Sequence, residues 1–417
     1  MRFLYTLLVH LLLPVALVRL VWRARRQPGY LEHVGERFGF YVEKIEGPLI
    51  WIHAVSVGET RAAQPVIRML SERYPAHRIL LTHMTPTGRE TGATLFRDPV
   101  IQCYLPYDFP WAVARFLGYF RPRAGIVMET EIWPNLIRAC ASRGIPCYLV
   151  NARLSDKSFR GYQRFGDLAR QALEALAAVS AQTTDDARRL TALGGREVRV
   201  TGNVKFDIAA PRELVDRGME WRQGFGASRP VLLAASTRDG EEALILERIG
   251  EIRVPGLLTV IVPRHPQRFD EVAEVIRQLG LRFQRRSHKD ESISPETQVL
   301  LGDSMGEMFA YYTACDVAFI GGSLLPYGAQ NLIEACAVGK PVLIGPSTYN
   351  FAEATEGAVA AGAAIRVADA GALAREAAKL LLDHDRRERM GQAALAFCTA
   401  HRGATARVVD LIKLRAS

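Results

Sequence analysis

The chain has 417 residues and a mass of 46.2 kDa, a length typical of two domains rather than of one hydrophobic core. Hydrophobic residues make up 49% and charged residues 23%, which excludes a disordered, collagen-like or coiled-coil protein. The formal net charge of +9 is compatible with nucleic acid, an anionic membrane or an anionic substrate. Residues 1–212 hold 29 Lys/Arg against 18 Asp/Glu, whereas residues 213–417 hold 24 against 26, so we expect the first half to meet the anionic partner.

The first predicted element is an apolar segment over residues 3–22, about long enough to cross a ~30 Å hydrocarbon core as a helix. His10, Pro14 and Arg19 interrupt it, so the sequence predicts a membrane anchor that either spans the bilayer or lies in its interface. Arginines at 23–26 follow, which predicts that the next domain stays in the cytoplasm. A cleaved signal peptide and a helix buried on the domain are the alternatives, although no A-x-A-like cleavage site follows.

Short apolar runs then alternate with helical stretches through the first half. Because such alternation is typical of βαβ units, it predicts a parallel sheet with right-handed crossovers. The predicted strands occupy residues 48–56, 77–85, 100–108, 123–131, 145–153, 177–183 and 196–205.

A polar, mixed stretch over residues 206–229 interrupts the alternation and predicts a helical linker. A second strand–helix series follows it, so we expect two α/β halves with a ligand crevice at the carboxyl ends of the strands. The predicted strands of the second half occupy residues 229–237, 257–266, 281–287, 297–304, 316–323 and 340–347, and Ala-rich helices are predicted near 370–382 and 385–415.

Six cysteines are scattered along the chain, and no two form a C-x-x-C pair. All but Cys103 lie in apolar or Ala-rich surroundings, which favours buried, reduced thiols over a zinc site. Reduced thiols are typical of a cytoplasmic compartment. The six positions are Cys103, Cys140, Cys147, Cys315, Cys336 and Cys398.

The first motif at a strand end is HAVSVGET, over residues 53–60. Gly58 permits a tight turn into a helix. Glu59 falls at the helix start, where a carboxylate accepts a proton from an attacking hydroxyl. The alternative is that Glu59 is only a first-turn acid that stabilises the helix dipole.

Two more strand ends of the first half carry charged residues. METEIWPN (128–135) has two acids, Glu129 and Glu131, which indicates a site; alternatively, Glu131 is a helix-terminal acid with Trp133 in the core. Lys205 ends the last strand, where a lysine neutralises a phosphate or carboxylate unless it is a solvated surface residue.

In the second half, Ser236 and Thr237 follow a strand and precede a helix, which predicts either an anion site at the helix N-terminus or a plain N-cap. Arg264 ends the next strand and offers bidentate phosphate binding. The longest motif is a Gly-rich loop and helix over residues 321–335, which matches neither G-x-G-x-x-G nor a P-loop. Glu334 falls in the first turn of that helix.

With these motifs, the chain resembles the 3-deoxy-D-manno-octulosonate (Kdo) transferases of lipopolysaccharide synthesis from the N-terminal segment to the last helices. It departs from the family pattern at Ala329, where glycine is frequent, and at Leu332, where proline is frequent, while Gln330 occupies a position that is His or Gln in relatives. The motifs are HAVSVGET (53–60), METEIWPN (128–135), TGNVKFD (201–207), PRHPQRF (263–269), GGSLLPYGAQNLIEA (321–335) and GPSTYNF (345–351).

The resemblance implies a GT-B glycosyltransferase with two Rossmann-like domains facing across a cleft and an N-terminal membrane-anchor helix. The implied donor is CMP-Kdo, and the implied acceptor is lipid IVA, the bisphosphorylated precursor of lipid A, at the cytoplasmic side of the inner membrane. The implied division is a membrane anchor at 1–22, an acceptor-binding domain at 23–210, a linker at 211–228, a CMP-Kdo-binding domain at 229–395 and a C-terminal helix at 396–417 that packs back toward the first domain.

The resemblance also implies a role for each site residue. Glu59 would be the general base, Glu129 and Lys205 would support the transition state, and Ser56 and Gly58 would lie on the acceptor side. The implied donor-binding residues are Ser236, Thr237, Pro263, Arg264, Met305, Gly306, Glu307, Asn331, Leu332, Ile333 and Glu334, with Glu334 on the ribose.

The implied reaction is an inverting transfer that uses neither a metal nor another cofactor; no H-E-x-x-H motif occurs in the sequence. One alternative is another GT-B enzyme that moves a different nucleotide-linked sugar to a lipid. A second is a non-catalytic, membrane-anchored protein that binds sugar nucleotides. No nucleic-acid partner is expected, because no stripe of aromatic and basic residues accompanies the charge. We expect anionic inner-membrane lipid and the bisphosphorylated acceptor to face the basic half.

Overall fold

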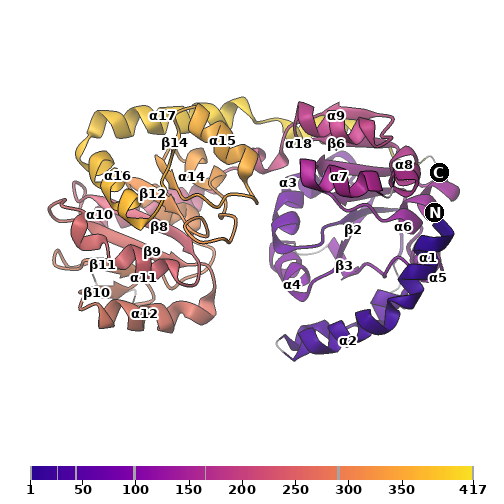
Figure 1. The fold of residues 1–417 in the computed structure, drawn as a ribbon, viewed down its shortest axis with the longest axis horizontal. Coiled ribbons are helices and arrows are strands. Elements are labelled where there is room, and N and C mark those ends of the chain that lie inside the picture. Colours follow the sequence, from indigo (N-terminus) through magenta and orange to yellow (C-terminus); the bar gives the residue numbers. More distant parts are fainter. Residues whose placement is uncertain are drawn as a thin grey trace. The chain divides into compact units, whose positions relative to one another are not determined.

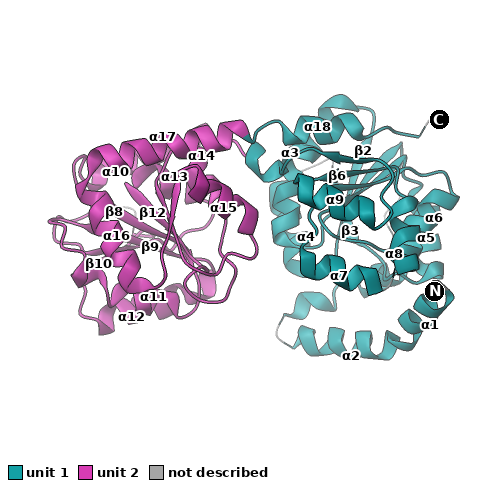
Figure 2. Cartoon of the chain, turned by 45° about the horizontal axis from the view of Figure 1, so that its top comes forward, with its two compact units in different colours: residues 1–207, 401–417 teal, residues 208–400 magenta. Residues whose placement is uncertain are grey.

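The computed structural model describes residues 2–25, 27–42, 45–96, 100–164, 166–288 and 292–415. The chain divides into two compact units (Figure 2). Unit 1 comprises Met1–Asp207 and His401–Ser417, and unit 2 comprises Ile208–Ala400. The chain therefore leaves unit 1, builds unit 2 and returns to unit 1.

Within the described residues, unit 1 holds a sheet of seven parallel strands in the order β3-β2-β1-β4-β5-β6-β7. The strands are nearly continuous apolar runs, as is typical of a sheet with helices on both faces (Figure 1). Their bounds are β1 Leu49–His53, β2 Arg78–His83, β3 Val100–Tyr104, β4 Ala124–Met128, β5 Cys147–Ala152, β6 Ala178–Ala181 and β7 Val198–Val200. The helices of this unit are α3 Val57–Arg73, α4 Pro86–Leu95, α5 Pro110–Phe120, α6 Pro134–Ser142, α7 Asp156–Arg164, α8 Gly166–Glu174, α9 Thr184–Ala192 and α18 Ala404–Leu411.

The centre of unit 1 is the pair β1 and β4. Trp51 on β1 is fully buried, and its indole N–H donates to the Thr82 hydroxyl on β2 at 2.8 Å. Gly125 lies beside it on β4, and a Cβ there would approach the Trp51 ring to 2.7 Å. The strand order reverses between β1 and β4, and ligands of open α/β sheets bind at such a switch point.

Unit 2, over its described residues, holds a second sheet of seven parallel strands in the order β10-β11-β9-β8-β12-β13-β14, with its switch point between β8 and β12. The strand bounds are β8 Val231–Thr237, β9 Leu258–Pro263, β10 Phe283–Arg285, β11 Val299–Leu301, β12 Val317–Ile320, β13 Val342–Ile344 and β14 Ala364–Arg366. The helices are α10 Arg212–Phe225, α11 Glu241–Leu246, α12 Phe269–Gln278, α13 Met308–Ala314, α14 Ile333–Ala337, α15 Ala352–Ala360, α16 Ala370–Leu382 and α17 His384–Ala400.

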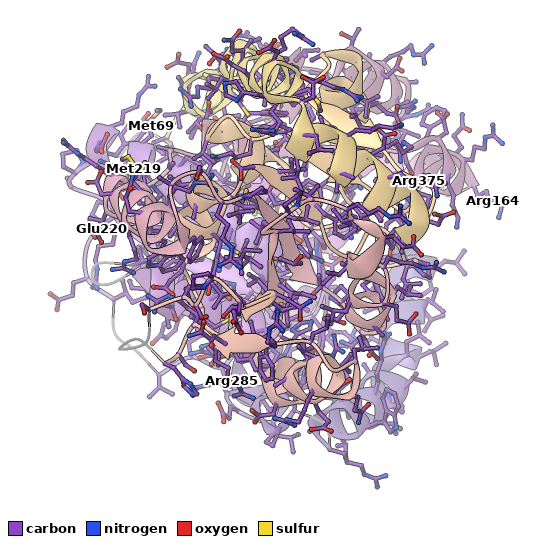
Figure 3. The ribbon with its side chains drawn as sticks, turned by 90° about the vertical axis from the view of Figure 1, so that its left-hand side faces the viewer. Met69, Arg164, Met219, Glu220, Arg285 and Arg375 are labelled. Atoms are coloured by element: carbon purple, nitrogen blue, oxygen red, sulfur yellow. The ribbon has the colours of Figure 1, made fainter. Side chains whose placement is uncertain are left out.

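The expected pattern of two parallel α/β sheets is thus confirmed, with local differences. The stretch expected as a helical linker is α10, which packs against α13 within unit 2. Strand β14 was not predicted, and the helix expected over 385–415 is divided into α17 and α18. On the edge strand β10, Arg285 forms an ion pair with Asp270 at 2.7 Å; Figure 3 labels this arginine in a view of the whole chain.

The return of the chain to unit 1 is fixed by one carboxylate. Asp207 accepts hydrogen bonds from the backbone N–H groups of Gly403 and Thr405, at 2.6 and 2.5 Å. Helix α18 then packs against α3. Val408 and Ile412 belong to the same hydrophobic core as the buried side chains of α3 and β1. The six cysteines are buried and reduced, as expected.

The N-terminal segment is a bent pair of helices, α1 Arg2–Leu11 and α2 Leu13–Ala24, rather than one continuous helix. Pro14 stands at the start of α2, where a proline ring prevents continuation of the preceding helix. Among the described residues, no single helix is long and apolar enough to cross a bilayer. Taken together, the two helices of this pair have that length and composition, although they are bent by 44°. Figure 1 shows the pair in indigo along one side of unit 1.

Helix α1 is hydrogen-bonded to the rest of unit 1. The Tyr5 hydroxyl donates to Asp108 at 2.9 Å, and the Thr6 hydroxyl donates to Asn135 at 3.3 Å. The side chains that face away are large and apolar. These exposed residues are Phe3, Leu4, Leu7, Leu8, Leu11, Leu12, Val15, Leu17, Val18, Val21 and Trp22.

Candidate active site

Glu59 is held at the carboxyl end of β1 by a capping box. Ser56 is the N-cap of α3; its hydroxyl accepts from the Glu59 N–H at 3.4 Å and donates to Glu59 Oε1 at 3.0 Å. The second carboxylate oxygen, Oε2, accepts from the N–H of Val55 at 2.7 Å. The carboxyl group is therefore fixed in one orientation at the switch point of unit 1, and its residue is only 8% exposed.

The surroundings of Glu59 raise its proton affinity. Burial and the neighbouring carboxylate of Glu129 raise the pKa of Glu59 to about 8, against the lowering effect of the hydrogen bond from Val55. A carboxylate with a pKa near neutrality is a much stronger base than an ordinary surface glutamate. Glu59 thus lies in the first turn of α3, and its raised pKa is compatible with the role of a base, which stays a prediction.

Glu129 follows the last residue of β4 and pairs with Lys205. Its backbone has a φ of +58°, and its N–H donates to the Val150 carbonyl at 2.8 Å. Lys205, in the 3-10 turn Val204–Asp207 after β7, donates from Nζ to Glu129 Oε1 at 2.7 Å. The sequence showed no basic partner for Glu129, because the two residues lie 76 positions apart.

Glu131 lies on the same loop and is held by its own neighbour. Its Oε2 accepts from the indole N–H of Trp133 at 2.8 Å, and burial raises the pKa of Glu131. The Trp133 ring meets the ring of His53 edge-on at 6.1 Å and packs against the core. Burial lowers the pKa of His53 to about 3, so this ring is neutral. The unit therefore brings Glu59, Glu129, Glu131 and Lys205 to one end of its sheet.

In unit 2, Ser236 and Thr237 close β8. Ser236 has a φ of +56°, and Thr237 is 1% exposed with its hydroxyl donating to Glu242 Oε1 at 2.8 Å. The helix expected to open beside these residues starts only at Glu241, after the N-cap Gly240. A turn therefore separates Ser236 and Thr237 from this helix, and neither residue is its N-cap.

The Gly-rich loop after β12 closes on itself and leads into α14. The N–H of Ala329 donates to the Gly322 carbonyl at 2.7 Å, and Asn331 Nδ2 donates to Glu334 Oε1 at 3.2 Å. Leu332 and Ile333 are fully buried.

The other predicted donor residues lie at the ends of β9 and β11. Pro263 ends β9, and the N–H of Arg264 donates to the Thr237 carbonyl at 2.9 Å. After β11, Met305 is 53% exposed and Gly306 has a φ of +80°. The next residue, Glu307, forms an ion pair with Arg217 of α10 at 2.9 Å.

Glu241 and Glu242 stand in the first turn of α11, and both are buried. Glu242 binds Arg268 at 2.6 Å, and Glu241 binds main-chain N–H groups. Arg268 belongs to the motif PRHPQRF (263–269), which is the sequence signal for its contact with Glu242. Among the described residues, no group of three or more His, Cys, Asp or Glu side chains is placed to hold a metal ion.

Comparison with known proteins defines the class of the chain. A family model described as "3-Deoxy-D-manno-octulosonic-acid transferase (kdotransferase)" matches residues 32–208. A second, described as "Glycosyl transferases group 1", matches residues 282–397. Each model covers most of one sheet, and together they define a glycosyltransferase.

Full-length relatives identify the family. The chain is 45% identical to the 3-deoxy-D-manno-octulosonic acid transferase of Bordetella pertussis, over 99% of both proteins. It is 38% identical to the enzyme of the same name from Haemophilus influenzae, over 99% of this chain and 98% of the relative. The chain belongs to the family of 3-deoxy-D-manno-octulosonic acid transferases, which confirms the resemblance found in the motifs.

Solved structures of low identity share the fold. The UDP-GlcNAc 2-epimerase of Neisseria meningitidis matches with a TM-score of 0.61 and 17% identity over 87% of this chain and 99% of the epimerase. The Anabaena protein Alr3699/HepE matches with a TM-score of 0.60 and 15% identity over 87% of this chain and 98% of that protein. These similarities show the GT-B fold with two Rossmann-like sheets.

Proposed function

We propose that this Kdo transferase moves Kdo from CMP-Kdo to lipid IVA, in an inverting reaction without a metal, during synthesis of the lipopolysaccharide core. Family membership supports the donor and the acceptor. The observation that carries the chemistry is Glu59, whose carboxyl group is fixed at the switch point of unit 1 with its pKa raised to about 8.

In the proposed reaction, Glu59 removes the proton of an acceptor hydroxyl as its oxygen attacks the anomeric carbon of Kdo. The bond from that carbon to the phosphate oxygen of CMP breaks, and CMP leaves with the bonding electron pair. Attack from the face opposite CMP inverts the anomeric configuration. Glu129 and Lys205, paired at 2.7 Å, support the transition state.

Unit 1 takes the acceptor role in this proposal, and unit 2 takes the donor role. Ser56 orients Glu59 through its hydroxyl, and the helix start at Gly58 leaves room for the acceptor. On the donor side, Arg264 neutralises the phosphate of CMP and Glu334 binds the ribose. The proposed nucleotide-binding residues also include Pro263, Ser236, Thr237, Met305, Gly306, Glu307, Asn331, Leu332 and Ile333.

The proposed location is the cytoplasmic side of the inner membrane. The α1–α2 pair presents a row of exposed apolar side chains, and residues 1–212 carry the positive charge that an anionic leaflet attracts. Because Tyr5 and Thr6 hydrogen-bond to unit 1, the interfacial arrangement of the anchor is favoured over a spanning one.

The test is mass spectrometry of the product formed from lipid IVA and CMP-Kdo by the purified full chain. We expect a mass increase of one or more Kdo units and release of CMP in equal number. CMP should inhibit competitively with CMP-Kdo, and UDP should not. Inhibition by UDP, together with no product from CMP-Kdo, would instead support a GT-B enzyme that uses another sugar nucleotide.

A further inference from the structure

Glu241 is a fully buried acid whose carboxylate binds three main-chain N–H groups. Oε2 accepts from Arg238 at 2.9 Å and from Gly322 at 2.5 Å. Oε1 accepts from Leu324 at 2.9 Å. Arg238 follows β8, whereas Gly322 and Leu324 follow β12, so one side chain joins the two loops at the switch point of unit 2.

These three contacts require a carboxylate. An ionised carboxylate is an acceptor at both oxygens, whereas an amide replaces one of them with an NH₂ donor. In either orientation, the NH₂ of a glutamine at position 241 would face at least one of the N–H groups of Arg238, Gly322 and Leu324. A buried N–H group that faces another donor loses its hydrogen bond and repels its neighbour.

The bound loop is also the one that positions the start of α14. The carbonyl groups of Gly321 and Gly322 accept from the N–H groups of Gln330 and Ala329, at 2.9 and 2.7 Å. These bonds close the loop directly before Asn331. At Gly321 the loop also lies against the end of β8, because a Cβ on Gly321 would lie 2.5 Å from the Ser236 carbonyl oxygen.

We propose that Glu241 is a positioning residue for the sugar-nucleotide donor. It fixes the main chain of residues 321–324 and, through the closed loop, the place of Asn331 and Glu334. This role rests on the proposed function in one respect, namely that Asn331 and Glu334 bind the nucleotide. Glu241 itself touches no reacting atom.

The experiment compares Glu241→Gln with wild type and with Glu247→Gln, an exposed acid next to the end of the same helix. Calorimetry with CMP as the probe gives Kd, and steady-state kinetics give KM for CMP-Kdo and for the acceptor. For Glu241→Gln we expect Kd for CMP and KM for CMP-Kdo to rise at least about tenfold, with acceptor KM unchanged. The Glu247→Gln variant should stay within twofold of wild type, an effect below about 0.4 kcal/mol.

A second variant separates positioning from folding. Glu241→Asp keeps the charge on a shorter side chain and should recover part of the CMP affinity that Glu241→Gln loses. A lower kcat with wild-type Kd and KM values in both variants would mean fewer folded molecules and would overturn the proposal. If wild type itself fails to bind CMP, the proposed donor is wrong, which is a different outcome from a wild-type Kd in Glu241→Gln.

Discussion

The two units share one topology, yet they use their acidic residues in opposite ways. At the switch point of unit 1, Glu59 is held but keeps a raised pKa, and Glu129 faces a lysine on a distant loop. At the switch point of unit 2, the carboxylates of Glu241 and Glu242 are occupied in binding N–H groups, a hydroxyl and an arginine. In the proposed reaction, the acids of the first unit therefore act as reagents, whereas those of the second unit hold structural contacts.

The largest effect expected from this contrast is that of Glu59→Gln. Glutamine preserves a capping box but cannot take a proton, so kcat should fall by about 10²–10⁴-fold. The matched control is Glu72→Gln, an exposed acid on the same helix α3. Product formation from CMP-Kdo and lipid IVA measures kcat, and calorimetry should show an unchanged Kd for CMP. A kcat near that of wild type would remove Glu59 as the base.

Lys205→Met should have the next largest effect. It leaves Glu129 without the cation at 2.7 Å and removes a positive charge from the reacting end of the unit, so kcat should fall about tenfold to a hundredfold. Lys379→Met breaks an exposed Lys–Glu pair in unit 2 and should leave kcat unchanged. Equal losses in both variants would contradict a special role for the Glu129–Lys205 pair.

Glu242→Gln tests the structural role of the acidic residues in unit 2. The change weakens the buried contact with Arg268, so the free energy of unfolding should fall by about 1–3 kcal/mol. Because Glu242 shapes unit 2 and takes no part in proton transfer, kcat at saturating CMP-Kdo should remain within a few-fold of wild type. Urea denaturation and initial rates check the two halves of this prediction, and a large loss of kcat at full donor saturation would contradict it.

The smallest expected effect is a shift in pH dependence. A base is active when deprotonated, so wild-type kcat/KM should rise with pH through about 8, the pKa of Glu59. Glu129→Gln removes a neighbouring negative charge that raises this pKa. The rise of kcat/KM with pH should therefore occur at lower pH in this variant, toward the ordinary glutamate pKa of 4.5. Initial rates across a buffer series measure this shift. An unchanged pH profile of kcat/KM in Glu129→Gln would show that Glu129 does not raise the pKa of Glu59.

The sequence was sufficient for most of the fold, because buried parallel strands are continuous apolar runs that alternate with helices. It failed where a signal was short or depended on distant contacts. Strand β14, Ala364–Arg366, lies within an Ala-rich stretch whose composition is typical of a helix, so no apolar run marks it as a strand. The break between α17 and α18 had one local signal, Gly403, whose φ is +86°.

The candidate site was predictable where local sequence determines local geometry. Ser56 and Glu59 form a capping box three residues apart, and that spacing can be recognised in any sequence. The pairing of Glu129 with Lys205 was not predictable, since it depends on how β4 and β7 are ordered in the sheet. Nor was the burial of Glu241, whose partners on the β12 loop lie more than 80 positions away.

The return of the chain to unit 1 has a consequence for synthesis on the ribosome. Val408 and Ile412 belong to the core of unit 1, and Asp207 keeps two N–H partners at Gly403 and Thr405. The first 207 residues therefore emerge from the ribosome with an unfilled core face, and they complete their packing only after the whole of unit 2 has been translated. Unit 2 is continuous in sequence, so the second unit to be synthesised should be the first to reach its final packing, in reverse of the usual N-terminal-first order.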